Sequence, residues 1–191
     1  FANQPCEHLG RTPMQNWKGL LFDGQRDVAR DLERLTLGDM DFSGYSLNHV
    51  ELHECRYNWK TFIEVYLEDY HVEPFHPGLG SFVTCDNLRW EFAERASVQF
   101  VGVHNGLANP GTRTYEHWHK AVLDYCRGEQ PPHGAIWLTY YPNIMVEWYP
   151  HVLVVSTLIP KAPDRTLNIV EFFYPEEIQA FEREFIEAEQ A

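Results

Sequence analysis

The sequence lacks any long apolar run and is short of positive charge. No hydrophobic stretch approaches the ~18 residues that a membrane span requires, and the N-terminal residues show no basic-then-apolar secretory pattern. The chain has 15 lysine and arginine residues against 28 aspartate and glutamate residues, so its net charge is −13. Such an average field repels nucleic acid and anionic lipid. We therefore expect a cytoplasmic protein with small-molecule or protein ligands and no nucleic-acid or membrane partner.

Closely spaced cysteines are also missing. The four cysteines are scattered and include no C-x2-C pair, which fits reduced thiols better than a disulfide framework. There is likewise no G-x-S-x-G and no glycine-rich phosphate loop. These absences leave no common motif for a serine hydrolase or a nucleotide-binding enzyme.

The chain does contain enough apolar side chains for one substantial core. It has 191 residues, of which 44% are hydrophobic and 15% aromatic, so we expect a single domain over 1–191 with large buried side chains or a roomy apolar cavity. Periodicity and turn residues predict helices over 26–37, 58–74, 112–127 and after Pro175, and strands over 19–22, 45–57, 81–85, 88–92, 96–103, 135–141, 144–149, 152–159 and 167–174. Strands that follow strands after short turns pair antiparallel. We therefore predict an α+β domain whose curved antiparallel sheet wraps partly around helices and forms a pocket.

The stretch NWKTFIEVYLEDYHVEPFH, residues 58–76, combines an apolar stripe with a polar face. At about 100° per residue, Glu64, Glu68 and His71 fall on one side of the expected helix. The apolar stripe recurs at helical spacing, and Pro74 is expected to end the helix. Its members are Trp59, Phe62, Ile63, Tyr66 and Tyr70.

Two histidines in this stretch are candidate metal ligands. His71 and His76 are five apart, and an unbroken helix would turn their rings about 140° away from each other. A break at Pro74 allows His76 to fold back toward His71, so that both imidazoles can bind one divalent Fe, Zn, Cu or Ni ion. A chance His-x4-His spacing and a solvated acidic face are the alternatives, and spacing alone does not decide between them.

The whole string resembles the iron-binding motif in the catalytic domain of Rieske non-haem iron oxygenases, the α subunits of aromatic-ring-hydroxylating systems. That motif reads N-W-K, E-N-Y and E/D-x-Y-H-x4-H-P, and this chain departs from it mainly at Val65, where many members have Asn. The resemblance implies a helix-grip (START/Bet v 1-like) fold and Fe(II) bound by His71 and His76. It also implies that Glu68 links this iron to the [2Fe-2S] cluster of a neighbouring subunit, and that Glu64 has a supporting position.

The same resemblance implies an activity and partners. Members hydroxylate an organic, typically aromatic, substrate with O2, using electrons that pass from NAD(P)H through a reductase or ferredoxin and the Rieske cluster. A homotrimer or larger ring of α subunits is expected. The identity of the substrate, and the choice between mono- and dioxygenation, are not readable from the motif.

The sequence departs from the family pattern in two places. A Rieske cluster needs C-x-H and C-x2-H, and the chain offers only Cys6-Glu7-His8. The family's third iron ligand is an aspartate on a C-terminal helix, where this chain has six glutamates and no aspartate after Pro175. We therefore expect a fragment that lacks the Rieske domain and the last helix, with the missing ligand beyond Ala191, and that is inactive in isolation.

Two other functions remain open at this point. The helix-grip shape also suits a metal-free module that binds hydrophobic ligands, and two histidines with a nearby glutamate suit a zinc hydrolase. His117 and His119 are two apart on a predicted helix, which favours surface or packing roles. His104 follows a strand and either lines the pocket or packs in the core.

Overall fold

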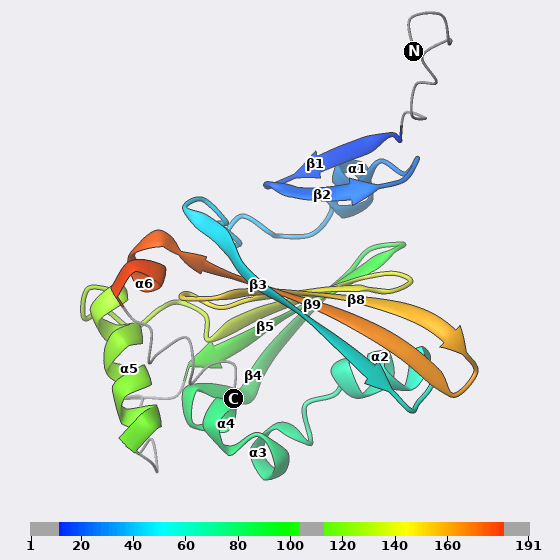
Figure 1. The fold of residues 1–191 in the computed structure, drawn as a ribbon. Coiled ribbons are helices and arrows are strands. Elements are labelled where there is room, and N and C mark those ends of the chain that lie inside the picture. The colour runs from blue at the N-terminus through cyan, green and yellow to red at the C-terminus, as the bar shows by residue number, and fades with distance from the viewer. Residues whose placement is uncertain (1–11, 104–112, 182–191) are drawn as a thin grey trace, which may run out of the picture.

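The computed structural model describes residues 12–103 and 113–181, and its centre is a seven-stranded antiparallel sheet (Figure 1). The strand order is β3-β9-β8-β7-β6-β5-β4, so the first long strand of the sheet pairs with the last. The α+β helix-grip fold predicted from the sequence is thereby confirmed. The strands are β3 (Tyr45–Cys55), β4 (Val83–Phe92), β5 (Ala96–Val103), β6 (Ala135–Tyr140), β7 (Ile144–Trp148), β8 (Leu153–Ala162) and β9 (Arg165–Pro175).

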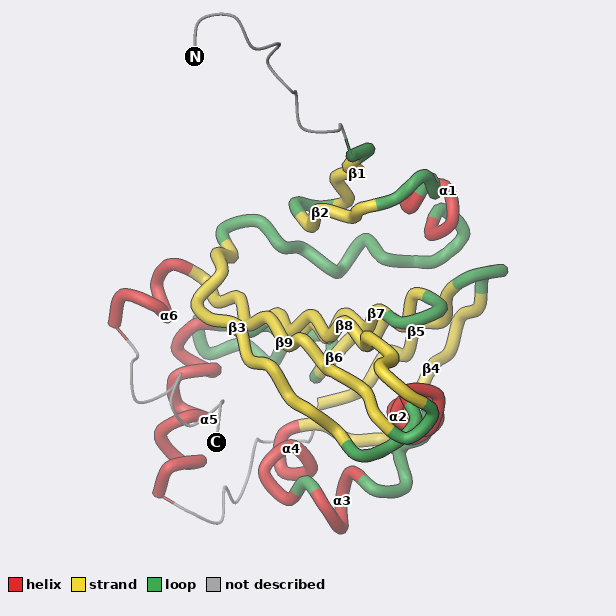
Figure 2. The backbone as a smooth tube through the Cα atoms, turned by 45° about the vertical axis from the view of Figure 1, so that its right-hand side comes forward, coloured by secondary structure: helices red, strands yellow, loops and turns green. Residues whose placement is uncertain are grey.

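The two sides of the sheet are covered by different elements (Figures 1 and 2). A two-stranded hairpin with a short helix lies on one side, and three short helices lie on the other; α5 (Arg113–Tyr125) and α6 (Glu176–Phe181) lie near one end of the sheet. The hairpin side has β1 (Met14–Trp17), β2 (Leu20–Asp23) and α1 (Val28–Leu32), and the opposite side has α2 (Trp59–Tyr66), α3 (Val72–Phe75) and α4 (Pro77–Phe82). None of the described helices is long and apolar enough to cross a membrane.

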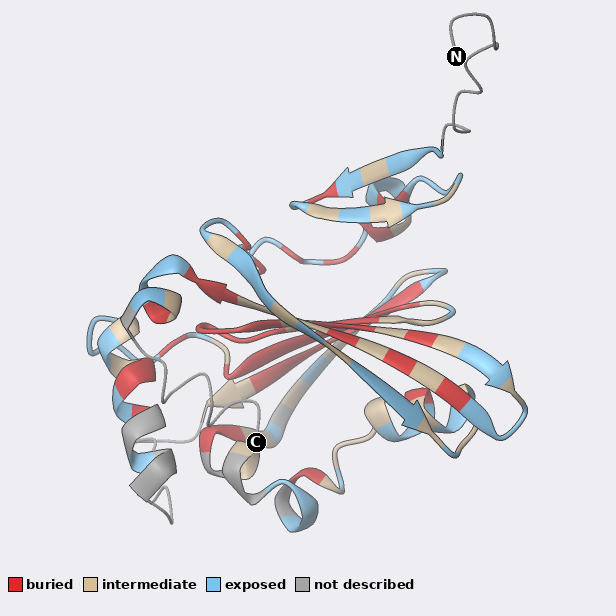
Figure 3. Ribbon diagram, in the orientation of Figure 1, coloured by how far each residue is buried: buried red, intermediate tan, exposed pale blue. Residues whose placement is uncertain are grey.

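The central strands are buried along much of their length (Figure 3), and their side chains alternate between the two faces of the sheet. The hairpin face is the set of sheet residues that packs with the hairpin and α1, and its buried members in β5 to β8 are Ala96, Val98, Phe100, Ile136, Leu138, Tyr140, Val146, Trp148, Leu153 and Val155. The site face is the opposite set, which packs against α2, α3 and α4. It includes Val101, Trp137, Met145 and Tyr149.

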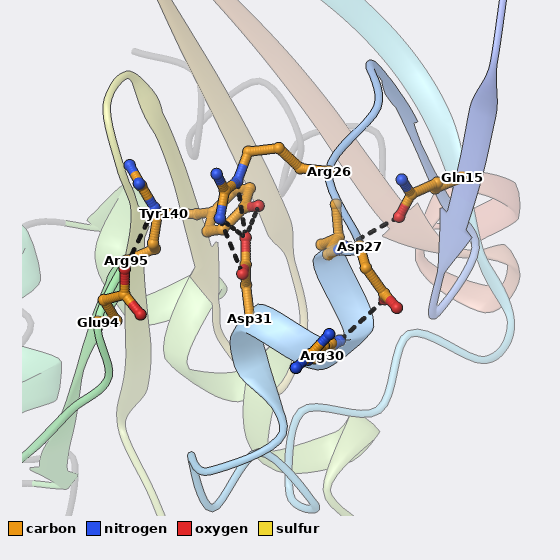
Figure 4. A network of polar contacts seen from close by, with 9 residues as sticks. Gln15, Arg26, Asp27, Arg30, Asp31, Glu94, Arg95 and Tyr140 are labelled. Carbon is orange, nitrogen blue, oxygen red and sulfur yellow. Dashed lines mark hydrogen bonds and ion pairs between the residues drawn. The ribbon is translucent and has the colours of Figure 1, made fainter.

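A polar network attaches the N-terminal segment to the sheet (Figure 4). Asp27 caps α1 by accepting a hydrogen bond from the Arg30 amide at 3.0 Å. Asp31 accepts from Arg26 at 2.9 Å and from the Tyr140 hydroxyl of β6 at 2.7 Å. The hydrogen bond from Tyr140, followed by that from Arg26, lowers the pKa of the Asp31 carboxyl.

Three predictions, which concern β4, α1 and β3, differ from the structure. Residues 81–92 form one irregular strand, β4, whose register with β5 shifts between Thr84 and Arg89, instead of two strands. The predicted helix over 26–37 shortens to α1, because the chain turns after Leu32. Strict alternation along the predicted strand over 45–57 places Leu47 and His49 on one face, but a bulge pairs them with Phe173 and Phe172, which point to opposite sides.

Candidate metal centre

The helix that precedes the two histidines is shorter than predicted. Asn58 caps α2 by accepting a hydrogen bond from the Lys60 amide at 2.9 Å, and Ile63 is buried against the site face with Met145 and Leu158. The helix ends at Tyr66 rather than at Pro74. Tyr70 is 87% exposed, so it does not belong to the apolar stripe.

The turn after α2 brings Glu68 onto His71. One carboxylate oxygen of Glu68 accepts from the Tyr70 amide at 2.7 Å, and the other contacts Nδ1 of His71 in a short hydrogen bond. Because an ionised carboxylate only accepts hydrogen bonds, Nδ1 of His71 is the donor. Its Nε2 then carries the lone pair that a metal needs, which is the usual arrangement for a metal-ligating histidine.

The short helix α3 brings the two histidines together. His71 precedes α3, and His76 follows it with φ −124° and ψ 65°, outside the helical region. Pro74 lies within the first turn of α3, where proline is tolerated. The rings are therefore adjacent, as predicted, but the break that allows this is the non-helical backbone of His76 after α3, rather than Pro74.

The separation of the rings suits shared metal ligation. The centroids of His71 and His76 are 5.3 Å apart, and the ring planes are inclined by 74°. Two imidazoles bound to one first-row metal at about 2.1 Å have centroids roughly 4.6 to 5.3 Å apart, for N–metal–N angles of about 90° to 110°. The pair fits two neighbouring positions of a divalent metal with a preference for nitrogen ligands.

A cavity of about 410 Å³ opens between the histidines and the site face. The sheet contributes Trp137, Glu147 and Tyr149. The Tyr149 hydroxyl donates to the Glu147 carboxylate at 3.0 Å and accepts from the Trp137 indole at 3.2 Å. The helical side and its connections contribute Phe62, Val65, Tyr66, Glu68, His71, Val72, His76 and Leu79.

Burial in this region shifts two titrating groups. Burial, followed by the nearby charge of Glu147, raises the pKa of the Tyr66 phenol well above its ordinary value. Partial burial, followed by the charge of His71, lowers the pKa of His76. A lower pKa keeps the imidazole neutral at physiological pH, and the neutral ring is the form that ligates metals.

Residues 42–191 match the family model of the ring hydroxylating α subunit (catalytic domain). The chain belongs to this family. Two curated relatives match the chain over its full length, and both are named putrescine 2-hydroxylase. The protein from Ralstonia nicotianae is 68% identical, and the protein from Bordetella bronchiseptica is 59% identical. The chain spans 53% and 45% of their lengths, so it matches about half of each relative.

Solved structures share the fold of this catalytic domain. A quaternary ammonium Rieske monooxygenase in complex with an inhibitor superposes with a TM-score of 0.69 at 18% identity, over 94% of this chain and 46% of that one. Naphthalene 1,2-dioxygenase from a Rhodococcus species superposes with a TM-score of 0.61 at 14% identity, over 93% of this chain and 48% of that one. At these identities the likeness carries the fold alone.

The third ligand of the expected metal site stays a prediction. Within the described parts of the chain, no three His, Cys, Asp or Glu residues are grouped so that they can hold a metal. Glu176 and Glu177 begin α6 and are exposed. The other glutamates of the expected last helix, and the aspartate expected beyond Ala191, lie outside the described residues.

Of the remaining candidates, Glu64 and His119 have described side chains, and neither lines the cavity. Glu64 is exposed on α2 and does not line it. His119 is buried at 5% exposure, in agreement with a packing role. His104 and the Cys6-Glu7-His8 sequence lie outside the described residues, as does the side chain of His117.

One cavity residue was not identified from the sequence. Glu147 lies in a run of β-branched and aromatic residues, where alternation alone leaves its direction ambiguous. The sequence does contain one indication of its direction. Glu147 is two residues from both Met145 and Tyr149, and residues at this spacing in a strand share a face. The aromatic residues of this region divide between the two faces: Trp137 and Tyr149 line the cavity, whereas Trp148 belongs to the hairpin face.

Proposed function

We propose that this chain is the iron-containing part of an oxygenase that hydroxylates a small aliphatic amine with O2. The observation that carries the proposal is the pair of adjacent rings of His71 and His76 at the wall of a cavity that is lined mainly by apolar side chains. In this proposal both histidines bind Fe(II) through Nε2. A carboxylate outside the described residues completes the site.

The overall reaction consumes one O2, two electrons and two protons, and yields a C–OH group and one water. Iron bound in this way supplies a centre with open positions for O2 activation. The chain's own residues hold the two imidazoles, exclude bulk water with the aromatic walls of the cavity, and orient the substrate C–H bond. The two electrons come from NAD(P)H.

Glu68 has a separate role in this proposal. Its carboxylate accepts the Nδ1 proton of His71, which fixes the ring orientation and tautomer of that ligand. Glu68 is also 32% exposed at its side chain, so it reaches both the ligand and the surface. We propose that it connects the iron site to a Rieske [2Fe-2S] cluster on a neighbouring subunit, in a trimer or larger ring supplied by a reductase or ferredoxin.

The substrate proposal follows from the full-length match to the two relatives. Both are named for hydroxylation of putrescine, a four-carbon diamine. We therefore propose an aliphatic diamine in place of the aromatic substrate expected from the family resemblance. The rest of the length of these relatives leaves room for the proposed Rieske domain, and the isolated 191 residues are expected to be inactive.

The test uses the full-length protein that contains this chain, together with an NADH-dependent reductase. We expect putrescine-dependent O2 uptake, a hydroxylated product labelled from ¹⁸O2, and one mononuclear iron per chain beside the cluster iron. A preparation with an intact Rieske cluster but no second iron would falsify the proposal. Amine binding without iron or oxygen uptake indicates the metal-free binding module, and hydrolysis that depends on zinc but not on O2 indicates the hydrolase.

A further inference from the structure

The sheet forms one wall of the cavity, and an interior strand of this wall carries a carboxylate. Glu147 lies in β7, an interior strand, and its register partners are Trp137 in β6 and Val154 in β8. Its side chain is only partly accessible and lines the cavity. Removing a carboxylate from water is unfavourable unless the group is hydrogen-bonded or paired with a cation. A purely structural role on a central strand would be filled better by an apolar residue.

A relay of hydrogen bonds fixes this carboxylate. The Trp137 indole donates to the Tyr149 hydroxyl at 3.2 Å, and the same hydroxyl donates to Glu147 at 3.0 Å. Both aromatic residues stand on the same sheet as Glu147, so the carboxylate is held in one orientation. A carboxylate offers about four acceptor positions, so the hydrogen bond from Tyr149 does not by itself exclude a bound ligand.

The surroundings of Glu147 suit a cation. The described lining of the cavity has two carboxylates, Glu147 and Glu68, among mainly apolar and aromatic side chains, and Glu68 hydrogen-bonds His71. The rings of Tyr66 and Trp137 lie 6.4 Å apart in a tilted arrangement near Glu147. Aromatic faces attract ammonium groups, and the attraction is stronger when water is excluded.

We propose that Glu147 binds a protonated amine of the substrate, with the faces of Trp137, Tyr149 and Tyr66 as the walls around the alkyl ammonium. The inference rests on the proposed function, because it places the reacting carbon between this anchor on β7 and the metal at His71 and His76. The recognised class is a small aliphatic amine cation. An aromatic carboxylate of similar size is excluded by repulsion from Glu147.

The first experiment measures binding without turnover. Metal-free full-length protein is heated with putrescine, with 1-butylamine or with 1-butanol, in wild type and in the Glu147→Gln variant. We expect putrescine and 1-butylamine to raise the melting temperature of wild type, 1-butanol to have no effect, and Glu147→Gln to lose the response. Stabilisation of Glu147→Gln equal to that of wild type would overturn the inference.

The second experiment measures turnover in the iron-loaded protein with its electron supply. Removal of one partner from a desolvated charge pair weakens binding roughly 30-fold or more. We therefore expect KM for putrescine to rise by at least that factor in Glu147→Gln. Because the iron ligands are untouched, iron content and uncoupled NADH oxidation should stay at the wild-type level. An unchanged KM would contradict the role of Glu147.

Matched variants separate binding from folding. Glu171→Gln changes a half-buried carboxylate of β9 whose alternation places it on the hairpin face, and it should retain the wild-type KM. Tyr149→Phe removes the orienting hydrogen bond and should raise KM by a smaller factor than Glu147→Gln. Equal increases in KM in Glu171→Gln and Glu147→Gln would show a general structural effect and overturn the inference.

Failure of the inference and failure of the proposed function are distinguishable. If wild type contains mononuclear iron and hydroxylates a non-cationic compound, while amines neither bind nor react, the oxygenase stands and the amine anchor is wrong. If amines bind through Glu147 but no mononuclear iron is found, the anchor stands and the oxygenase is wrong.

Discussion

The two faces of the sheet are equally buried and differ in chemistry. In β5 to β8 the buried hairpin face is apolar apart from the tips of Tyr140 and Trp148, whose hydroxyl and indole groups are hydrogen-bonded. The site face buries polar side chains in the same strands: Ser97, Gln99, Thr139 and Ser156. Neighbouring residues of one strand therefore serve different purposes. The hairpin face stabilises the fold by burying apolar side chains. The site face contributes less hydrophobic stabilisation, because it contains polar groups and borders a cavity.

The histidine pair provides the largest expected effect on activity. His71→Ala removes one of two adjacent nitrogen ligands, so we expect mononuclear iron to be lost and hydroxylation to fall to background. The melting temperature should change little, because the ring lies at the cavity wall. Iron analysis and product formation check this, with His53→Ala on β3 as the control. Full activity in His71→Ala would exclude the proposed metal centre.

The contrast between the faces is tested by two equally buried neighbours. Leu138 and Gln99 are each 1% exposed, on the hairpin face and the site face respectively. We expect Leu138→Ala to lower the free energy of unfolding by about 2 to 5 kcal/mol, because it leaves a cavity in a dry core. Gln99→Leu exchanges one hydrogen bond to the Tyr66 carbonyl for apolar burial, so its effect should stay below about 1 kcal/mol.

Urea unfolding of the full-length variants measures both changes. Leu138→Ile is the control for volume and should cost less than about 1.5 kcal/mol. A Gln99→Leu variant as unstable as Leu138→Ala would mean that the buried polar groups of the site face are structural rather than retained for function.

The link between Glu68 and His71 is expected to have an intermediate effect. Groups that orient a metal ligand typically contribute about 10- to 100-fold to activity or metal affinity. We expect Glu68→Gln to slow NADH-coupled hydroxylation by a factor in this range, while KM for the amine stays near wild type. Asp69→Asn, one residue away, is the control. A normal rate in Glu68→Gln would remove Glu68 from both proposed roles.

The attachment of the hairpin should give the smallest effect. Tyr140→Phe removes the hydrogen bond to Asp31 and should reduce stability by about 1 kcal/mol at neutral pH. Because the pKa of Asp31 is lowered in the folded protein, this contribution is fully present above the ordinary value of 3.8 and is lost as the pH falls through the folded value.

The difference between Tyr140→Phe and wild type should therefore shrink in acid. Unfolding at neutral pH and below the ordinary pKa of Asp31 measures it, and Asp23→Asn in β2 is the control. A difference that grows in acid would show that Asp31 is not the titrating partner.

Several strands were predicted well, because the residue pattern that identifies a strand lies within the strand itself and the turns beside it. Alternation of β-branched and aromatic residues and proline-containing turns gave β6, β7 and β9 to within about two residues. The bulges in β3 and β4 were missed, because an extra residue is set by register with a partner strand and leaves no local mark. The N-terminal hairpin was predicted only in part, since its four-residue strands are shorter than the window that periodicity needs.

The site was predicted through its motif and not through its geometry. The adjacent rings of His71 and His76 agree with the prediction, but the extended helix drawn through Glu68 does not exist. The chain leaves the helix at Tyr66, because Glu68 turns back to accept the Tyr70 amide. Glu147 is distant in sequence from the motif, and only the folded sheet brings it to the cavity.

The cavity is assembled from two separable pieces of chain. The histidines lie beside short helices between β3 and β4. Glu147 and its supporting aromatics instead come from β6, β7 and the residue directly after β7. Mutations in the second piece can alter which molecules are accepted and leave the first piece intact. Under the proposed function, exchange of single strand residues therefore changes which substrate is bound, while the two candidate iron ligands stay in place.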